Sequence, residues 1–165
     1  MNPKPKEVNV KARIENYAKL GANFFRTLYQ LQQEVDKSGI DPKFLDLIKI
    51  RASQINGCAY CIDMHTIDAR AHGETEQRIY ALNAWREGPF FDDRERAVLE
   101  FTEAVTRVSE THVPDEVFDE VRQHFSEQEI LSLTIAVATI NTWNRLAITV
   151  RAQPGQYKPA AAKAS

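Results

Sequence analysis

The two cysteines of the chain, Cys58 and Cys61, have C-x-x-C spacing, and His65 follows the second of them by four residues. Such a pair can form a reversible disulfide or bind a metal ion. In a helix, residues three or four positions apart lie on one face, so His65 lies one turn beyond Cys61 and can take its proton. This spacing predicts thiol redox chemistry.

A helix boundary is predicted immediately before the cysteine pair. Gly57 can adopt the left-handed conformation that ends many helices, so we expect a new helix to begin near Cys58. Unpaired N–H groups at a helix N-terminus favour the thiolate form of Cys58, whereas the nearby histidine favours that of Cys61. These residues alone leave open which cysteine is the nucleophile.

Asp46 is the candidate acidic partner of the histidine. It lies eleven residues before Gly57, and His65 lies eight residues after it. If the two helices form an antiparallel hairpin, these spacings place the residues roughly 16 and 12 Å from the turn. Asp46 is then expected to orient His65 and stabilise its imidazolium, directly or through a water. The alternative is a solvated acid near a helix N-terminus.

Zinc binding and a purely structural bridge are the alternative uses of the pair. Zinc takes four ligands, and the chain offers Cys58, Cys61, His65 and, farther along, His72, without a second C-x-x-C or a closely spaced histidine pair. We therefore expect no metal and no cofactor. His72 is expected to complement a helix C-terminus, and Tyr60 to form a wall of the site or a core contact.

Apolar residues that recur every three or four positions predict an all-α fold, a compact bundle of about six to seven helices. Helix-capping residues, prolines and glycines indicate where each helix begins and ends. The expected helices are 10–35, 42–56, 58–72, 76–85, 93–105, 114–125 and 126–150.

Length and composition fit a single domain over residues 1–165, with loose tails at 1–8 and 153–165. A hydrophobic content of 43%, a net charge of −2 and the absence of a basic cluster argue against nucleic acid and anionic membranes as partners. No apolar leader is visible near Met1, so we expect a cytoplasmic protein. Thiols are kept reduced there, which favours a catalytic or metal-binding role for the cysteine pair over a permanent structural bridge.

The longest apolar stretch, residues 130–150, invites comparison with a membrane span. Asn141, Asn144 and Arg145 interrupt it, so we expect a helix that is buried or faces another subunit. Several of its faces are apolar, and small residues on it allow close approach: Ser132, Ala136 and Ala138. A chain this short needs a partner to cover them, which predicts a homo-oligomer.

Residues 40–106 closely resemble the core of the AhpD-like alkylhydroperoxidases of the carboxymuconolactone decarboxylase superfamily, and the segment 141–146 resembles their closing helix. The residues that carry the resemblance are Asp46, Arg51, Ser53, Gly57, Cys58, Cys61, His65, Ala69, Arg70, Gly73 and Glu74. The resemblance implies an AhpD-like all-α fold, a homotrimer or homohexamer, and reduction of a hydroperoxide by a disulfide that a thiol or dithiol then reduces.

The resemblance also implies a role for each site residue. Cys61 matches the cysteine that attacks the peroxide, Cys58 the resolving cysteine and His65 the histidine of the proton relay. Two positions depart from the usual pattern, because Asp46 replaces a glutamate and Tyr60 replaces a histidine. A second hypothesis is a redox sensor or protein-interaction module that uses the same disulfide without efficient peroxidase activity.

Overall fold

The part of the chain that this computed structural model describes, residues 11–159, is built from helices and contains no strand. Seven α-helices within it have six or more residues, which confirms the predicted all-α bundle. The predicted tail at residues 1–8 lies outside the described residues. The helices are α1 (Tyr17–Leu20), α2 (Ala22–Asp36), α3 (Pro42–Asn56), α4 (Ala59–Ala71), α5 (Glu76–Ala81), the 3-10 helix η1 (Leu82–Ala84), α6 (Asp93–Thr106), α7 (Val108–Thr111), α8 (Asp115–His124) and α9 (Glu127–Val150).

Local capping signals explain where four of these helices begin. The Asp41 side chain accepts the N–H of the second residue of α3, whose first position is Pro42. Thr75 caps α5 in the same way. Asp92 and Ser126 each form a complete capping box, at α6 and α9. These four predicted starts are confirmed.

The predicted single helix over residues 10–35 is wrong, because the helix begins at Tyr17 and is interrupted at Gly21. Gly21 has φ −98° and ψ 17°, outside regular helical geometry. A side chain at this position would meet the Phe25 ring, since a Cβ there would lie 2.8 Å from Cε2. The glycine therefore allows Phe25 to pack against the break between α1 and α2.

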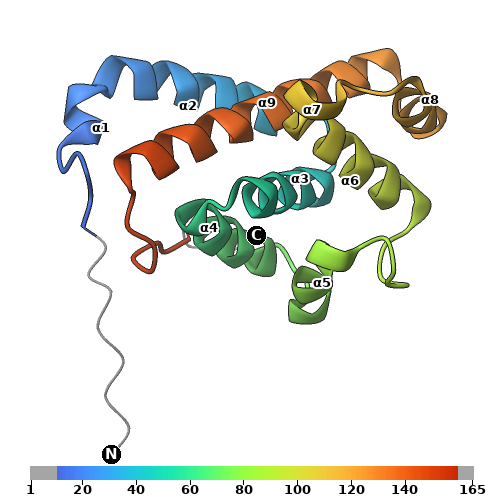
Figure 1. Cartoon of the computed structure of the whole chain (residues 1–165), viewed down its shortest axis with the longest axis horizontal. Coiled ribbons are helices and arrows are strands. Elements are labelled where there is room, and N and C mark those ends of the chain that lie inside the picture. Colours follow the sequence, from blue (N-terminus) through green and yellow to red (C-terminus); the bar gives the residue numbers. More distant parts are fainter. Residues whose placement is uncertain (1–10, 160–165) are drawn as a thin grey trace, which may run out of the picture.

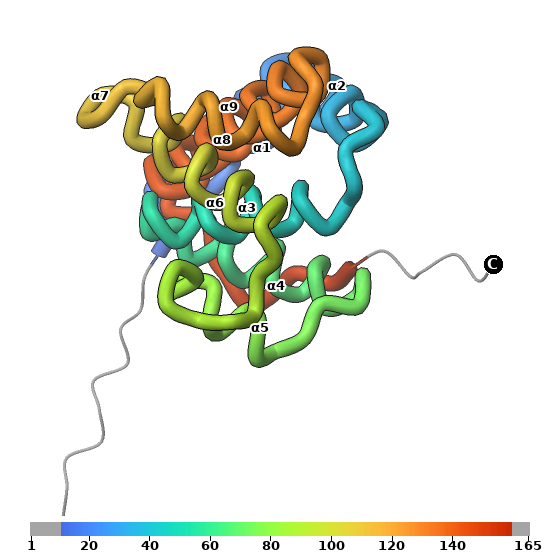
Figure 2. The backbone as a smooth tube through the Cα atoms, turned by 90° about the vertical axis from the view of Figure 1, so that its right-hand side faces the viewer, coloured from blue at the N-terminus to red at the C-terminus, as the bar shows by residue number. Residues whose placement is uncertain are grey.

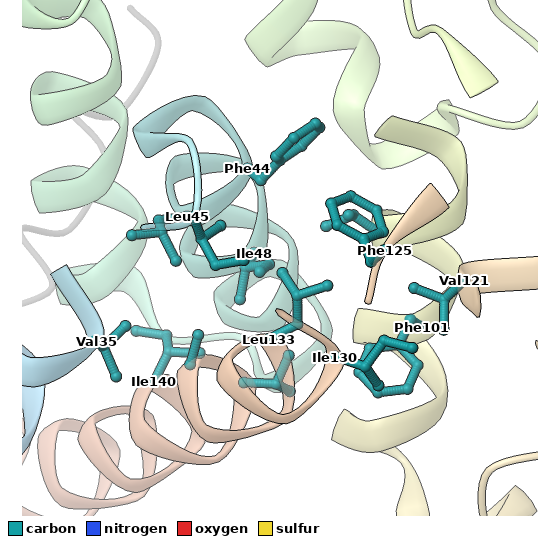
Figure 3. Packing of buried hydrophobic residues seen from close by; sticks show 14 of the residues in the cluster. Val35, Phe44, Leu45, Ile48, Phe101, Val121, Phe125, Ile130, Leu133 and Ile140 are labelled. Atoms are coloured by element: carbon teal, nitrogen blue, oxygen red, sulfur yellow. The ribbon is translucent and has the colours of Figure 1, made fainter. Parts of the chain in front are cut away.

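Helix α3 lies at the centre of the molecule and packs against α4, α6 and α9 (Figure 1). Seen from the side in Figure 2, α9 and α2 lie on one side of α3, and α4 and α5 lie on the other. The buried apolar residues of α3 therefore contribute to two hydrophobic cores. One faces α2, α6, α8 and α9 and includes Val35, Leu45, Ile48, Phe101, Phe125, Leu133 and Ile140 (Figure 3). The other includes Leu47, Ile50, Ala69, Ile79, Leu82, Trp85 and Leu99.

Helix α9 is partly buried and partly apolar on its outer side. Leu133, Val137 and Ile140 are buried in the core, whereas Leu131 is 60% exposed and Ile135 is 38% exposed. Among residues 11–159, no helix combines the length and the apolar character needed to cross a membrane.

Two asparagines of α9 fix the end of α3. The amide of Asn56 donates to Oδ1 of Asn141, at 3.0 Å, and to Oδ1 of Asn144, at 2.8 Å. Asn144 in turn donates to the hydroxyl of Ser53, at 3.0 Å. Buried amides need such partners, so the polar residues within the apolar stretch of α9 serve to hold the turn between α3 and α4.

Candidate active site

The turn between α3 and α4 places Cys58 at the start of a helix. Gly57 ends α3 in the left-handed conformation, with φ 68° and ψ 35°, which a glycine adopts without strain. Cys58 is the N-cap of α4, and its Sγ accepts the N–H of Cys61 at 3.3 Å. The predicted boundary is confirmed, and the sulfur itself acts as the capping atom.

The two cysteines are joined in a disulfide, with 5.3 Å between their Cα atoms. Both are almost completely buried. The structure therefore represents the oxidised form of the pair.

His65 lies one turn beyond Cys61 on α4 and is also buried. Its Nδ1 lies 3.8 Å from Oδ2 of Asp68, three residues farther along the same helix. Burial alone would raise the pKa of Asp68, but the nearby imidazole of His65 and the hydrogen bond from Tyr157 hold it below its ordinary value. Asp68, the acid of α4 that contacts His65, is thus an ionised aspartate. Sequence reasoning missed it even though i, i+3 spacing could have indicated it.

Asp46 is buried, with 6% of its surface exposed, so the alternative of a solvated acid is wrong. Its Oδ2 lies 2.7 Å from Nδ1 of His72, the residue that caps the C-terminus of α4. Burial raises the pKa of Asp46, and the charges of His72, Lys49 and His65 oppose that shift. The structure therefore pairs Asp46 directly with His72 and leaves its effect on His65 to charge.

Cys61 and His65 share the wall of a cleft with a volume of about 890 Å³, a size ordinary for sites that bind small organic molecules. Cys58 does not contribute to its described lining. Residues of α1, α2, α3, α4, α9 and the C-terminal segment surround it. Its aromatic side chains are Tyr17, Phe25, Tyr29, Tyr60, Trp143 and Tyr157.

The aromatic wall of this cleft is an ordered cluster. The rings of Phe25 and Trp143 stack with centroids 5.9 Å apart, and Tyr29 packs on the same indole at 4.9 Å. Tyr60 belongs to this wall, as predicted, and burial together with Tyr17 and Tyr29 raises its pKa. The tyrosine is therefore neutral at physiological pH and presents an apolar ring with a hydroxyl.

The C-terminal segment reaches the site as well. Residues 153–165 were predicted to form a loose tail; in the part of it that is described, through Pro159, two hydrogen bonds attach the chain to α4. One joins Gly155 to Asp63 and the other joins Tyr157 to Asp68. Contacts between residues about ninety positions apart leave no signal in a local sequence pattern.

The zinc hypothesis finds no support in the arrangement of side chains. Within residues 11–159, no group of three or more His, Cys, Asp and Glu side chains is placed to hold a metal ion. Both candidate thiolate ligands are joined to each other, and His72 contacts Asp46 rather than the cysteines.

Comparison with known proteins identifies similar sequences and folds. Residues 22–104 match the model of the carboxymuconolactone decarboxylase family. The chain is 42% identical over 135 residues to the uncharacterized protein YdfG of Bacillus subtilis (strain 168), covering 82% of this chain and 92% of that protein.

Solved structures agree with this result. A protein of unknown function from Agrobacterium tumefaciens, suggested to be the antioxidant defence protein AhpD, has 45% sequence identity and a TM-score of 0.86 over 89% of this chain and all of its own. An uncharacterized peroxidase-related protein from Ralstonia eutropha JMP134, with an AhpD core, has a TM-score of 0.75 at 20% identity, over 84% of this chain and 74% of that one. The second likeness concerns the fold alone.

Proposed function

This chain belongs to the carboxymuconolactone decarboxylase family, and on that premise we propose that it reduces organic hydroperoxides through reversible oxidation of Cys58 and Cys61. The observation that carries the proposal is that Cys61 and His65, one turn apart on α4, line the same cleft while Cys58 lies bonded behind them. A nucleophile and its base are thus available at the wall of the cleft, with the resolving cysteine bonded to the nucleophile behind it.

Cys61 is the attacking residue in this proposal. His65 takes the thiol proton, and the thiolate attacks the terminal oxygen of the hydroperoxide. The O–O bond breaks, the sulfur keeps the hydroxyl as a sulfenic acid, and the leaving alkoxide receives the proton from the imidazolium as the alcohol.

Cys58 completes the reaction as the resolving residue. Its sulfur attacks the sulfenic sulfur of Cys61, the disulfide forms, and the hydroxyl leaves with the Cys58 proton as water. Two thiols have then supplied two electrons to one hydroperoxide. A thiol or dithiol reductant returns the pair to its starting state by thiol–disulfide exchange.

Asp46 supports the relay through its charge. Asp46 is hydrogen-bonded to His72. The charge of His65 nevertheless lowers the pKa of Asp46, so Asp46 and His65 interact electrostatically. A carboxylate whose charge acts on the ring in this way stabilises the imidazolium that forms when His65 accepts the thiol proton.

The cleft favours an organic peroxide over hydrogen peroxide. Its aromatic wall offers an apolar surface that a carbon-bearing substrate can cover and a small polar oxidant cannot. We therefore expect cumene hydroperoxide to react faster than hydrogen peroxide with the reduced protein.

A homotrimer or homohexamer is the proposed assembly. On α9 the exposed residues Leu131 and Ile135 line up with Ala138, and around α2 Leu20 and Phe24 are 76% and 84% exposed. Apolar residues grouped in this way on one side of a helix are typical of surfaces that another subunit covers.

The test is consumption of cumene hydroperoxide by the reduced protein, followed in the presence of dithiothreitol, with Cys61→Ser as the control. Turnover that requires Cys61 supports the peroxidase. A disulfide that forms and is reduced again, without peroxide consumption above that of Cys61→Ser, would instead indicate the redox-sensing alternative.

A further inference from the structure

The chain after α9 turns back toward α4 (Figure 1), where two hydrogen bonds attach it to residues on either side of His65 in the sequence. The backbone N–H of Gly155 donates to Oδ2 of Asp63, at 2.7 Å. The hydroxyl of Tyr157 donates to Oδ1 of Asp68, also at 2.7 Å. Asp63 precedes the histidine by two residues and Asp68 follows it by three, so the segment is fastened across the part of α4 that carries the histidine.

Asp68 stands between the segment and the histidine. One of its oxygens accepts from Tyr157, and the other lies 3.8 Å from Nδ1 of His65. A hydrogen bond at one oxygen restricts rotation of the carboxylate, and the second oxygen then stays on the side of the imidazole. Tyr157 and Asp68 also line the cleft beside Cys61, which places this chain of contacts at the reacting sulfur.

We propose that Tyr157 is a positioning residue for the peroxide reaction: it fixes the carboxylate of Asp68, and Asp68 orients and stabilises the His65 imidazolium. This inference rests on the proposed peroxidase function. It assigns the direct acidic contact of the histidine to Asp68, one turn along α4, and gives the C-terminal segment a part in the site.

A pair at i, i+3 on a helix is weak by itself, because the two side chains keep much of their rotational freedom. A hydrogen bond to a charged oxygen is shorter and stronger than one between neutral groups, and 2.7 Å is within the range of such bonds. The Tyr157 hydroxyl therefore restricts the carboxylate where the helix alone does not.

The ionisation states agree with this geometry. Burial and the hydrogen bond to Asp68 raise the pKa of Tyr157 to about 12, so the phenol keeps its proton at physiological pH and donates it. Burial would raise the pKa of Asp68, but His65 and Tyr157, with a smaller contribution from the charge of His72, hold it low. Removing the phenol hydroxyl removes one of the groups that favour the carboxylate form.

The first test compares Tyr157→Phe with a matched control, Tyr80→Phe, in the full-length reduced protein. The Tyr80 hydroxyl also donates to a carboxylate, Oε2 of Glu76 at 3.2 Å, but it lies exposed on α5 away from the cleft. In single-turnover oxidation, Tyr157→Phe is expected to react about tenfold more slowly, equivalent to roughly 1.4 kcal/mol in the barrier. Tyr80→Phe should react at the wild-type rate.

Two peroxides separate positioning from substrate contact. A residue that positions the histidine should slow hydrogen peroxide and cumene hydroperoxide by the same factor. A residue that only forms a wall of the cleft should slow the bulky peroxide alone, and that result would overturn the proposal.

The second test does not depend on activity. Carbon-13 carboxyl NMR follows the titration of Asp68, assigned with Asp68→Asn, and its midpoint should rise in Tyr157→Phe and stay unchanged in Tyr80→Phe. If the wild type consumes no peroxide, the proposed function fails and this titration still decides whether Tyr157 holds Asp68. An active enzyme in which Tyr157→Phe leaves both the rate and the Asp68 midpoint unchanged would refute the inference alone, and so would a slower rate with an unchanged midpoint.

Discussion

Asp46 and His72 are hydrogen-bonded to each other at 2.7 Å, although 26 residues separate them. His72, the C-cap of α4, follows His65 by seven residues, so the two lie on one face of the helix, two turns from each other. An acid on α3 that faces this stripe can meet either ring. The structure places Asp46 beside His72, at the end of the helix, so Asp46 can act on His65 only through its charge.

Asp46→Asn should lower peroxidase turnover by about threefold to tenfold, because the amide keeps the shape of the side chain and removes its charge. Asp46→Glu keeps the charge and should retain turnover. Steady-state rates with cumene hydroperoxide check both. His72→Gln is the control for the hydrogen bond, since it leaves the carboxylate in place; equal rates in Asp46→Asn and the wild type would show that only the structural contact to His72 matters.

The two cysteines should behave differently when each is replaced. Cys58→Ser should still be oxidised by peroxide and should accumulate a sulfenic acid, because no disulfide can form. Cys61→Ser should react much more slowly, since Cys58 is two turns from His65 and does not line the described cleft. Mass spectrometry of dimedone-labelled protein measures both. Strong labelling of Cys61→Ser and little of Cys58→Ser would reverse the assignment.

Glu103 should make stability depend on pH in the acid range. Burial alone would raise the pKa of Glu103. Hydrogen bonds from Trp85 and Arg86, together with the charge of Arg51, hold this pKa below its ordinary value of 4.5. A depressed pKa in the folded state means that the stabilisation is complete above about pH 4.5 and is lost as the pH falls through the folded-state value.

Glu103→Gln should therefore lower the free energy of unfolding by about 3 kcal/mol at pH 7, because it leaves Arg51 buried beside a neutral group. The loss should shrink as the pH drops below about 4.5. Urea denaturation between pH 7 and pH 3 measures it. Glu100→Gln is the matched control: this more exposed glutamate also pairs with Arg86, and its removal should cost less than about 1 kcal/mol at any pH.

Static light scattering should give a mass three or six times the 18.8 kDa of one chain. The double variant Phe24→Arg, Leu131→Arg places charges on the two exposed apolar surfaces and should reduce the mass to that of a monomer. Val108→Arg, at a 50% exposed apolar residue on α7, is the control and should leave the mass unchanged. A wild-type monomer at micromolar concentration would contradict the assembly.

Much of the fold could be predicted because its signals are local. Asp41, Thr75, Asp92 and Ser126 cap helices through atoms only two or three residues away, and Gly57 needs only its own backbone freedom. The cysteine pair and His65 were predictable for the same reason, since one helix carries all three.

The contacts that complete the site could not be read in this way. The bonds from Asp46 to His72 and from Tyr157 to Asp68 depend on how separate segments pack, and their partners are 26 and 89 residues apart. The break at Gly21 likewise depends on where the Phe25 ring lies, which the three- and four-residue spacing of apolar residues does not specify.

The sulfur of Cys58 is both a reacting atom and the cap of α4. Reduction breaks the S–S bond, so the Cys58 sulfur becomes a thiol sulfur that is no longer tied to Cys61. We therefore expect the hydrogen bond that this sulfur accepts from the Cys61 amide to differ in strength between the two redox states. The exchange rate of the Cys61 amide hydrogen with solvent should consequently differ between the two redox states, so that this one backbone group reports the oxidation state of the protein.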